Sequence, residues 1–260
     1  MTNILFIGDI VGKSGRNFLI SRLSFLLNDL KVDFAIANGE NAAAGFGITP
    51  AIAMDLFEAG IHVLTTGNHV WYRKEIIGFL EEEPCLLRPA NYPDSNPGRG
   101  SGIFKARNKA RIGVVNINGR VFMEPLDCPF QTLDRELSAM EGKTDIILVD
   151  LHAEATSEKM AMARYFQGRV SAVIGTHTHV QTADEAILPG GTAFISDAGM
   201  TGVSDSVIGM KSEIAIQRFL THIPDRLEPA KGPATISGVL ICVEENDGKA
   251  VSISRILVRE

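Results

Sequence analysis

Short apolar runs rich in β-branched residues alternate with longer stretches of helical periodicity along most of the chain. The short runs are Ile4–Ile7, Phe34–Ala37, His62–Thr66, Leu86–Arg88, Ile112–Asn116, Ile146–Val149, Val170–Ile174 and Ala193–Ile195. The helical patterns occupy Phe18–Leu30, Pro50–Ala59, Lys74–Glu82, Gln131–Met140 and Thr156–Phe166. This alternation predicts repeated βα units and therefore an α/β fold.

The C-terminal segment has a different pattern. Ile236–Val243 and Ala250–Val258 both alternate between apolar and polar residues, and they flank a turn that contains Asn246-Asp247-Gly248. Two such runs around an Asn-Asp-Gly turn predict an antiparallel hairpin that closes a sheet. Because no composition break marks a linker, we expect residues 1–260 to form a single domain with mixed strand direction near its end.

Composition narrows the kinds of partner that the protein can bind. The 260 residues carry a net charge of −6, which is unsuited to holding a long nucleic acid through its phosphates. Three widely spaced cysteines argue for a reducing compartment, and no apolar run approaches the roughly 20 residues of a membrane helix. We therefore expect a cytoplasmic protein that binds neither membranes nor long nucleic acids.

Residues able to bind metals follow five of the predicted strands, each at its carboxyl end. They are Asp9, Glu40, Asn68 with His69, His152, and His177 with His179. Taken singly, a histidine near a strand end is more often structural, and an aspartate there is often a helix N-cap. Because strand carboxyl ends form the usual ligand crevice of α/β sheets, we expect these residues to meet. Mixed nitrogen and oxygen donors suit zinc, manganese or iron.

The stretch Gly8-Asp9-Ile10-Val11-Gly12-Lys13-Ser14 looks at first like a phosphate-binding loop. A true loop of that kind has four residues between its glycine and the Gly-Lys-Ser/Thr, whereas only three separate Gly8 from Gly12. We therefore interpret it as a strand end that presents Asp9, followed by a helix. In this interpretation Ser14 is the N-cap of the helix and Lys13 is a solvated charge.

Other polar and aromatic residues allow two interpretations each. Arg88, Asn91, Arg99 and Gly100 belong to a Pro/Gly-rich loop that either lines a substrate pocket or only connects elements. Asp150 either supports His152 or is a buried structural carboxylate. Trp71 and Phe122 either stack on a base or serve core packing or an interface. The sequence therefore assigns no substrate-binding residue.

The candidate residues resemble a known family. Asp9, Gly67-Asn68-His69, His152 and Gly175–His179 follow the motif order of the calcineurin-like metallophosphoesterases. Two departures, Asp9-Ile10-Val11 for Asp-x-His and Gly39-Glu40-Asn41 for the usual Gly-Asp motif, are similar to the YmdB-like branch of bacterial cyclic-nucleotide phosphodiesterases. So are Arg88–Asn91, His152–Lys159 and Gly175–Asp184, and the resemblance extends from residue 4 to about residue 257.

This resemblance implies an α/β/β/α sandwich of two mixed β-sheets flanked by helices. It also implies two metal ions, iron and/or manganese, with zinc and magnesium as alternatives. Glu40 would bridge both ions. Asp9, Asn41 and His179 would complete one site, and Asn68, His152 and His177 would complete the other. His69 would lie beside the ions as a catalytic residue that is not a ligand.

The implied activity is hydrolysis of small phosphodiesters, namely 2′,3′- and/or 3′,5′-cyclic nucleotides, by a hydroxide that bridges the metals. Two cations lower the pKa of a bridging water and hold the phosphoryl oxygens for attack. His69 would donate a hydrogen bond to the phosphoryl group or protonate the leaving oxygen, unless it only orients the site. The expected partners are this small-molecule substrate and further copies of the chain, as a homo-oligomer.

Two alternatives stay open. A phosphomonoesterase or a nuclease acting on short RNA would use the same metals, although the acidic balance of the chain weakens the nuclease. A metal-binding regulatory protein with little turnover is the other alternative, because a fold does not fix a function.

Overall fold

The computed structural model describes all residues from 1 to 260. Its strands are β1 (Thr2–Ile7), β2 (Asp9–Ile10), β3 (Phe34–Asn38), β4 (Val63–Thr65), β5 (Ser101–Lys105), β6 (Arg111–Asn118), β7 (Ile146–His152), β8 (Ala172–Thr176), β9 (Ala186–Leu188), β10 (Thr192–Ile195), β11 (Met200–Val203), β12 (Ala234–Val243) and β13 (Ala250–Arg259). Its helices are α1 (Gly12–Asp29), α2 (Pro50–Ala59), the 3-10 helix η1 (Val70–Tyr72), α3 (Ile76–Glu82), α4 (Pro129–Met140), α5 (Thr156–Phe166) and α6 (Ser212–Thr221).

The strands form two mixed sheets. The seven-stranded sheet has the order β2-β11-β12-β1-β3-β4. The strands β11 and β1 pair with successive parts of one edge of β12, and β13 pairs with its opposite edge. The six-stranded sheet has the order β5-β6-β7-β8-β10-β9. In each sheet the central strands are parallel, whereas β12 and the two edge strands β5 and β9 run antiparallel to their neighbours.

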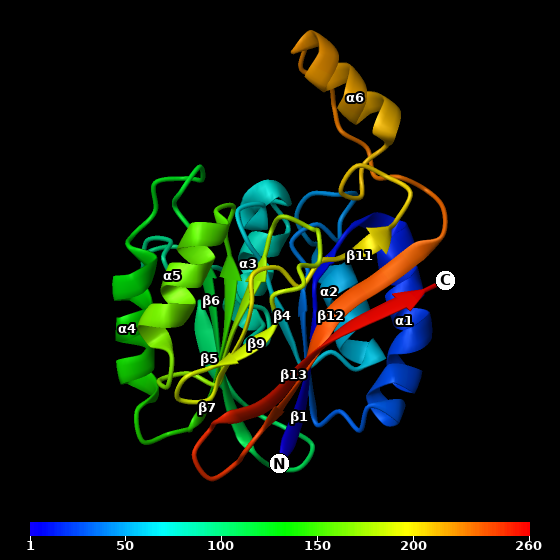
Figure 1. Ribbon diagram of the computed structural model, residues 1–260. Helices are drawn as coiled ribbons and strands as arrows, with labels where there is room; N and C mark the ends of the chain where they lie inside the picture. The colour runs from blue at the N-terminus through cyan, green and yellow to red at the C-terminus, as the bar shows by residue number, and fades with distance from the viewer.

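Alternating side chains in the strands explain the layers. In β1, Ile4 and Phe6 pack into a core cluster that also contains residues of β6, β7 and β8, so this cluster lies between the sheets. Leu5 and Ile7 instead join the cluster formed with α1 and α2. A third cluster joins the six-stranded sheet to α4 and α5. Figure 1 shows these helix pairs on opposite outer sides of the sheets, which confirms the predicted α/β/β/α sandwich.

Most of the predicted elements are present, and the predicted C-terminal hairpin is β12 and β13. Leu86–Arg88 is not a strand, because it makes only isolated bridges. Helix α1 begins at Gly12 after an extended Val11, so the prediction of Ser14 as its N-cap is wrong. The sequence pattern did not reveal α6, which projects from the body of the molecule in Figure 1.

Strand register places the candidate residues at one end of both sheets. The carboxyl ends of β1 and β3 lie side by side, since Ile7, the last residue of β1, pairs with Ala37, and Ala37 in turn pairs with Leu64 of β4. In the other sheet, His152 at the end of β7 pairs with Thr176 at the end of β8. The loops after these strands therefore meet in one region. None of the helices is long and apolar enough to cross a membrane.

Candidate metal centre

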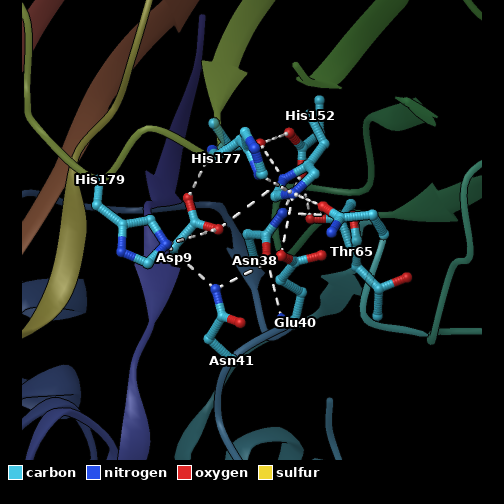
Figure 2. A network of polar contacts seen from close by, with 12 residues as sticks. Asp9, Asn38, Glu40, Asn41, Thr65, His152, His177 and His179 are labelled. Atoms are coloured by element: carbon cyan, nitrogen blue, oxygen red, sulfur yellow. Dashed lines mark hydrogen bonds and ion pairs between the residues drawn. The ribbon is translucent and has the colours of Figure 1, made fainter. Parts of the chain in front are cut away.

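The structure brings all eight candidate residues together where the two sheets meet. Figure 2 labels Asp9, Glu40, Asn41, His152, His177 and His179. The seven-stranded sheet contributes the oxygen donors Asp9, Glu40, Asn41 and Asn68, which follow β1, β3 and β4. The six-stranded sheet contributes the nitrogen donors His152, His177 and His179, from the end of β7 and the loop after β8. His69 follows Asn68 and belongs to the first group of loops.

Gly67 leaves the space in which two of these side chains meet. A Cβ atom at this position would lie 2.1 Å from Glu40 Oε2 and 2.4 Å from His152 Nε2. Because the added atom would fall among the side chains of two fully buried residues, any larger residue would have to displace these two candidate ligands. Gly67 therefore belongs to the centre although it carries no donor.

The hydrogen bonds of His152 determine which of its ring nitrogens faces the centre. The Thr176 hydroxyl donates to Asp150 Oδ1 at 2.7 Å, so its oxygen is free to accept a hydrogen bond from His152 Nδ1 at 2.9 Å. A proton on Nδ1 leaves the lone pair of Nε2 directed away from Thr176. That nitrogen lies 3.0 Å from Glu40 Oε1 and 3.1 Å from Asn68 Oδ1.

His177 is oriented in a similar way. Its Nε2 lies 3.1 Å from Glu154 Oε2, and burial together with the neighbouring His152 lowers the pKa of His177 to about 3. A neutral His177 therefore donates from Nε2 to Glu154, and this contact is a hydrogen bond rather than an ion pair. The lone pair of its Nδ1 then faces His152 Nε2 at 3.0 Å.

Four acceptor atoms thus converge: His152 Nε2, His177 Nδ1, Glu40 Oε1 and Asn68 Oδ1. Glu40, His152 and His177 form a group whose ligand atoms lie within 4.8 Å of one another, a grouping that can hold a metal ion. Such a cluster needs a positive charge, either a proton or a metal ion. Without metal, burial acts to lower the pKa of His152, but nearby Glu40 outweighs it and raises that pKa to about 9.

Asp9, Asn41 and His179 form a second, looser group. Asp9 is fully buried, and its Oδ1 atom has no hydrogen-bond partner although it lies 3.8 Å from His179 Nε2. His179 Nδ1 donates to the carbonyl of Ile208 at 2.9 Å, so Nε2 presents its lone pair to the Asn41 amide nitrogen at 3.1 Å. A buried carboxylate oxygen without a donor fits a cation, whereas the Asn41 amide would have to turn to offer its oxygen.

His69 lies beside the oxygen donors. Its Nδ1 is 2.8 Å from Asn41 Oδ1 and 3.1 Å from Glu40 Oε1, and its backbone N–H donates to Glu40 Oε2 at 3.2 Å. The ring packs edge-on against Phe46 and Tyr72, and the side chain is 18% exposed. His69 is therefore the candidate residue whose second ring nitrogen is left for a molecule outside the protein.

A buried ion pair supports the loop that carries His177 and His179. Both histidines have positive φ, 95° and 67°, a backbone conformation that side-chain-bearing residues rarely adopt. Between them, Thr178 donates to Asp197 Oδ2 from its backbone N–H at 3.0 Å and from its hydroxyl at 2.6 Å. Lys159 Nζ lies 3.0 Å from the same oxygen. These contacts hold the strained loop in place.

Asp150 joins the two sheets. Besides Thr176, its carboxylate accepts hydrogen bonds from the Thr65 hydroxyl and from Asn38 Nδ2 at 2.9 Å. Asn38 Oδ1 in turn accepts the backbone N–H of Glu40 at 3.0 Å. Burial raises the pKa of Asp150 to about 6. Of the two interpretations of this residue, support of the candidate ligands fits its contacts.

Several residues of the Pro/Gly-rich loop and two aromatic residues make contacts outside the metal centre. Arg88 bonds to the carbonyls of Pro89, Asn96 and Pro97, and Asn91 bonds to Asn118 and Asp127. Trp71 packs on Tyr92, and Phe122 is 89% exposed. Glu154 contacts His177, Tyr72 contacts His69, and Lys159 and Asp197 hold Thr178 between two candidates. The sequence did not single out these four residues, because isolated side chains in helices and loops carry no pattern.

Comparison with known proteins agrees with this geometry. The family described as YmdB-like protein matches residues 5–256. The chain belongs to the YmdB-like family. This match confirms the family resemblance seen in the motifs.

Relatives of this YmdB-like protein share most of its length. It is 48% identical over 257 residues to the 2′,3′-cyclic-nucleotide 2′-phosphodiesterase of Bacillus subtilis, an alignment that covers 99% of this chain and 97% of the relative. The crystal structure of a hypothetical protein from Thermus thermophilus has a TM-score of 0.93 at 42% identity, covering all of both chains. A novel phosphatase from Mycoplasma pneumoniae has a TM-score of 0.93 at 35% identity, covering 99% of this chain and 93% of the other.

Proposed function

We propose that this YmdB-like protein is a metal-dependent phosphodiesterase that hydrolyses 2′,3′- and/or 3′,5′-cyclic nucleotides. The observation that carries the proposal is the convergence of three acceptor atoms, from Glu40, Asn68 and His177, on the lone pair of His152 Nε2. Such an arrangement is costly without a cation, and the relative in Bacillus subtilis bears the name of a 2′,3′-cyclic-nucleotide 2′-phosphodiesterase.

The donors divide into two groups, which supports two ions. Asn68, His152 and His177 would hold one ion, Asp9, Asn41 and His179 the other, and Glu40 lies between the groups. Iron and manganese suit these imidazole, carboxylate and amide donors, with zinc and magnesium as alternatives. When bound, two such cations supply an activated water and neutralise charge on the phosphoryl oxygens.

The residues around the ligands have separate roles in this proposal. Asn41 and Glu40 orient His69 by accepting a hydrogen bond from its Nδ1, so that Nε2 can donate to the phosphoryl group or to the leaving oxygen when the ring carries both protons. Tyr72, 61% exposed and packed against His69, offers an aromatic surface to a base. The ligands come from both sheets, so we also propose that residues 1–260 act as one domain.

The proposal is tested by metal analysis together with a substrate panel. The panel contains a 2′,3′-cyclic nucleotide, a 3′,5′-cyclic nucleotide, a nucleoside monophosphate and a short RNA. We expect the wild type to hold two metal ions and to hydrolyse a cyclic nucleotide, and Glu40→Ala to lose metal and hydrolysis together. We expect His69→Ala to keep both ions and to lose turnover.

Four outcomes would contradict parts of this proposal. Full metal content and turnover in Glu40→Ala would show that the candidate residues are not the metal site. Full turnover in His69→Ala would show that His69 only orients the site. Hydrolysis of the nucleoside monophosphate alone would favour a phosphomonoesterase, the alternative that the phosphatase from Mycoplasma pneumoniae supports. Two bound metals without turnover of any substrate would favour a regulatory protein.

A further inference from the structure

A cavity of about 540 Å³ lies outside the metal centre, beside the start of α1. Its walls come from the first residues of α1, from Ala44 in the loop after Asn41, from Lys211 before α6, and from residues 226–231 after α6. None of the candidate metal ligands lines it. It is therefore a separate feature of the surface.

The lining of this cavity is strongly cationic. Five of its side chains are positively charged and one, Glu228, is acidic; the five are Lys13, Arg16, Lys211, Arg226 and Lys231. Lys211 is paired with Glu228 at 2.6 Å, whereas the other four cations form no ion pair. The Nε atom of Arg16 is buried without a hydrogen-bond partner. In a chain of net charge −6, this is a local excess of positive charge that the protein does not neutralise.

The start of α1 adds to the positive potential. Lys13 and Ser14 belong to the first turn of this 18-residue helix, which has no side-chain cap and no acidic residue in that turn. Backbone N–H groups in the first turn of a helix lack intrahelical partners, and the helix dipole favours an anion there. The Gly12 N–H already donates to the Asn41 carbonyl, so the cavity combines charged side chains with the N–H groups of its lining residues Lys13 and Ser14.

The walls are held in place before any ligand arrives. Pro229 packs so closely on Gly12 that a Cβ atom at Gly12 would lie 2.9 Å from the Pro229 ring. The backbone N–H of Lys211 donates to the Glu228 carbonyl at 2.9 Å, and that of Ala230 donates to the Gly209 carbonyl at 2.9 Å. A ligand therefore meets a preformed surface, which lowers the entropic cost of binding.

We propose that this cavity binds a small molecule that carries two or more phosphate groups. Its volume lies in the range of small-molecule sites, and its charge exceeds what one phosphate group would need. Leu227 is its largest apolar side chain and no aromatic ring lines it, so recognition rests on phosphate rather than on a base.

The site goes beyond the proposed hydrolysis and stands independently of it. The cavity is nonetheless close to the metal centre in the chain, because Gly12, which precedes the lining residue Lys13, donates its N–H to the Asn41 carbonyl at 3.0 Å. Ile208, three residues before Lys211, accepts the hydrogen bond of His179. The anion site and the metal centre are therefore neighbours with different residues, and variants can separate them.

Calorimetric titration of the metal-loaded protein at low salt tests the proposal, with fructose 1,6-bisphosphate as a weakly chelating probe and inorganic phosphate as comparator. We expect saturable binding of one bisphosphate, weaker binding of phosphate, and weakening of both as salt rises. Lys13→Gln with Arg226→Gln should weaken bisphosphate binding at least about tenfold. Lys105→Gln with Lys143→Gln, which removes two exposed cations elsewhere, should leave it within about twofold.

Glu40→Gln, or His177→Ala if the first variant does not fold, separates this site from the metal centre. We expect either variant to bind the bisphosphate as the wild type does. Loss of binding in these variants with retention in the Lys13/Arg226 variant would place the probe at the metal centre and overturn the proposal. Unchanged binding in the Lys13/Arg226 variant, equal binding of inorganic phosphate, or no saturable binding by the wild type would also overturn it.

Discussion

The two sheets contribute different chemistry to one centre, and each supports its donors by different means. The seven-stranded sheet presents oxygen atoms, and its loops leave space for them, most clearly at Gly67. The six-stranded sheet presents nitrogen atoms, and a neighbouring acceptor fixes the proton on the opposite side of each ring, as Thr176 does for His152. A carboxylate needs only enough space to bind a metal ion, because either of its oxygens can be the ligand. An imidazole also needs the correct tautomer.

Because of this difference, substitutions near the oxygen donors and near the nitrogen donors should reduce metal binding for different reasons. A substitution on the oxygen side should act through volume, and one on the nitrogen side through a lost hydrogen bond or an unpaired charge. Four substitutions test this comparison, in descending order of expected effect.

Gly67→Ala should have the largest effect, because the added Cβ would occupy the space of Glu40 Oε2 and His152 Nε2. We expect metal content and hydrolysis to fall at least about 100-fold while the protein stays folded. Elemental analysis, an activity assay and circular dichroism measure these quantities. Gly78→Ala is the matched control, since nothing lies within 4 Å of the added atom. Normal metal content in Gly67→Ala would show that the oxygen side is not limited by space.

Lys159→Met should destabilise the nitrogen side, because it leaves the buried Asp197 carboxylate without its cation. Breaking one half of a buried pair costs about 3–5 kcal/mol, so the free energy of unfolding in urea should fall by that order. Metal affinity should fall as well, since Asp197 holds Thr178 between two ligands. Lys249→Met, which breaks an exposed pair with Asp247, should change little. Equal effects of the two substitutions would contradict a supporting role for Lys159.

Thr176→Val should have a smaller effect, because it preserves shape and removes only the hydroxyl that accepts from His152 Nδ1. Loss of such an orienting partner typically lowers metal affinity about 10- to 100-fold. Thr66→Val is the control on the oxygen side, where the hydroxyl donates to the Leu87 carbonyl and contacts no ligand. Competition with a fluorescent chelator measures both affinities. If the two variants bind metal equally well, the tautomer of His152 does not matter.

His62→Asn should have the smallest effect, because His62 directly precedes β4 and is not one of the candidate residues. Its Nδ1 accepts the Ala35 N–H at 3.1 Å, and burial together with Arg107 lowers the pKa of His62. The unfolded chain therefore takes up a proton below about pH 6.5 that the folded protein resists. The free energy of unfolding should fall as the pH drops from about 7.5 to about 5.5, and less so in His62→Asn.

Urea denaturation at the two pH values measures this difference. His222→Asn, which replaces an exposed histidine at the end of α6, controls for the loss of a histidine outside the sheets. A fall in stability that is the same in wild type and His62→Asn would show that His62 does not take part.

The sequence revealed the fold through the parts that obey a simple period. Buried strands such as Phe34–Asn38 and Ile146–His152 are apolar throughout most of their length, and β12 and β13 alternate around a recognisable turn. Short strands such as β9 and β11 were missed because three or four residues carry too little periodicity. Helix α6 was missed because Phe219 and Leu220 are exposed, so its pattern is not that of a helix packed on a core.

Most of the candidate ligands could be found because they follow a strand, where topology brings them to the crevice, whereas Asn41 came only from the family resemblance. The residues that support them could not be found in this way. Lys159 lies in the middle of α5 and reaches Asp197 after β10, a contact between residues 38 positions apart. Nor does the sequence specify which nitrogen of His152 is protonated, since that depends on a hydroxyl of a neighbouring strand.

The separation of oxygen and nitrogen donors also sets an order during protein synthesis. All the oxygen donors lie within the first 68 residues, whereas the last imidazole is at residue 179. At typical ribosomal rates the last imidazole, that of His179, therefore emerges roughly 6–22 s after Asn68. An ion captured early by the nascent chain would meet only oxygen ligands, which suit magnesium or manganese. Selection for a metal that favours imidazole can begin only when the second sheet is complete.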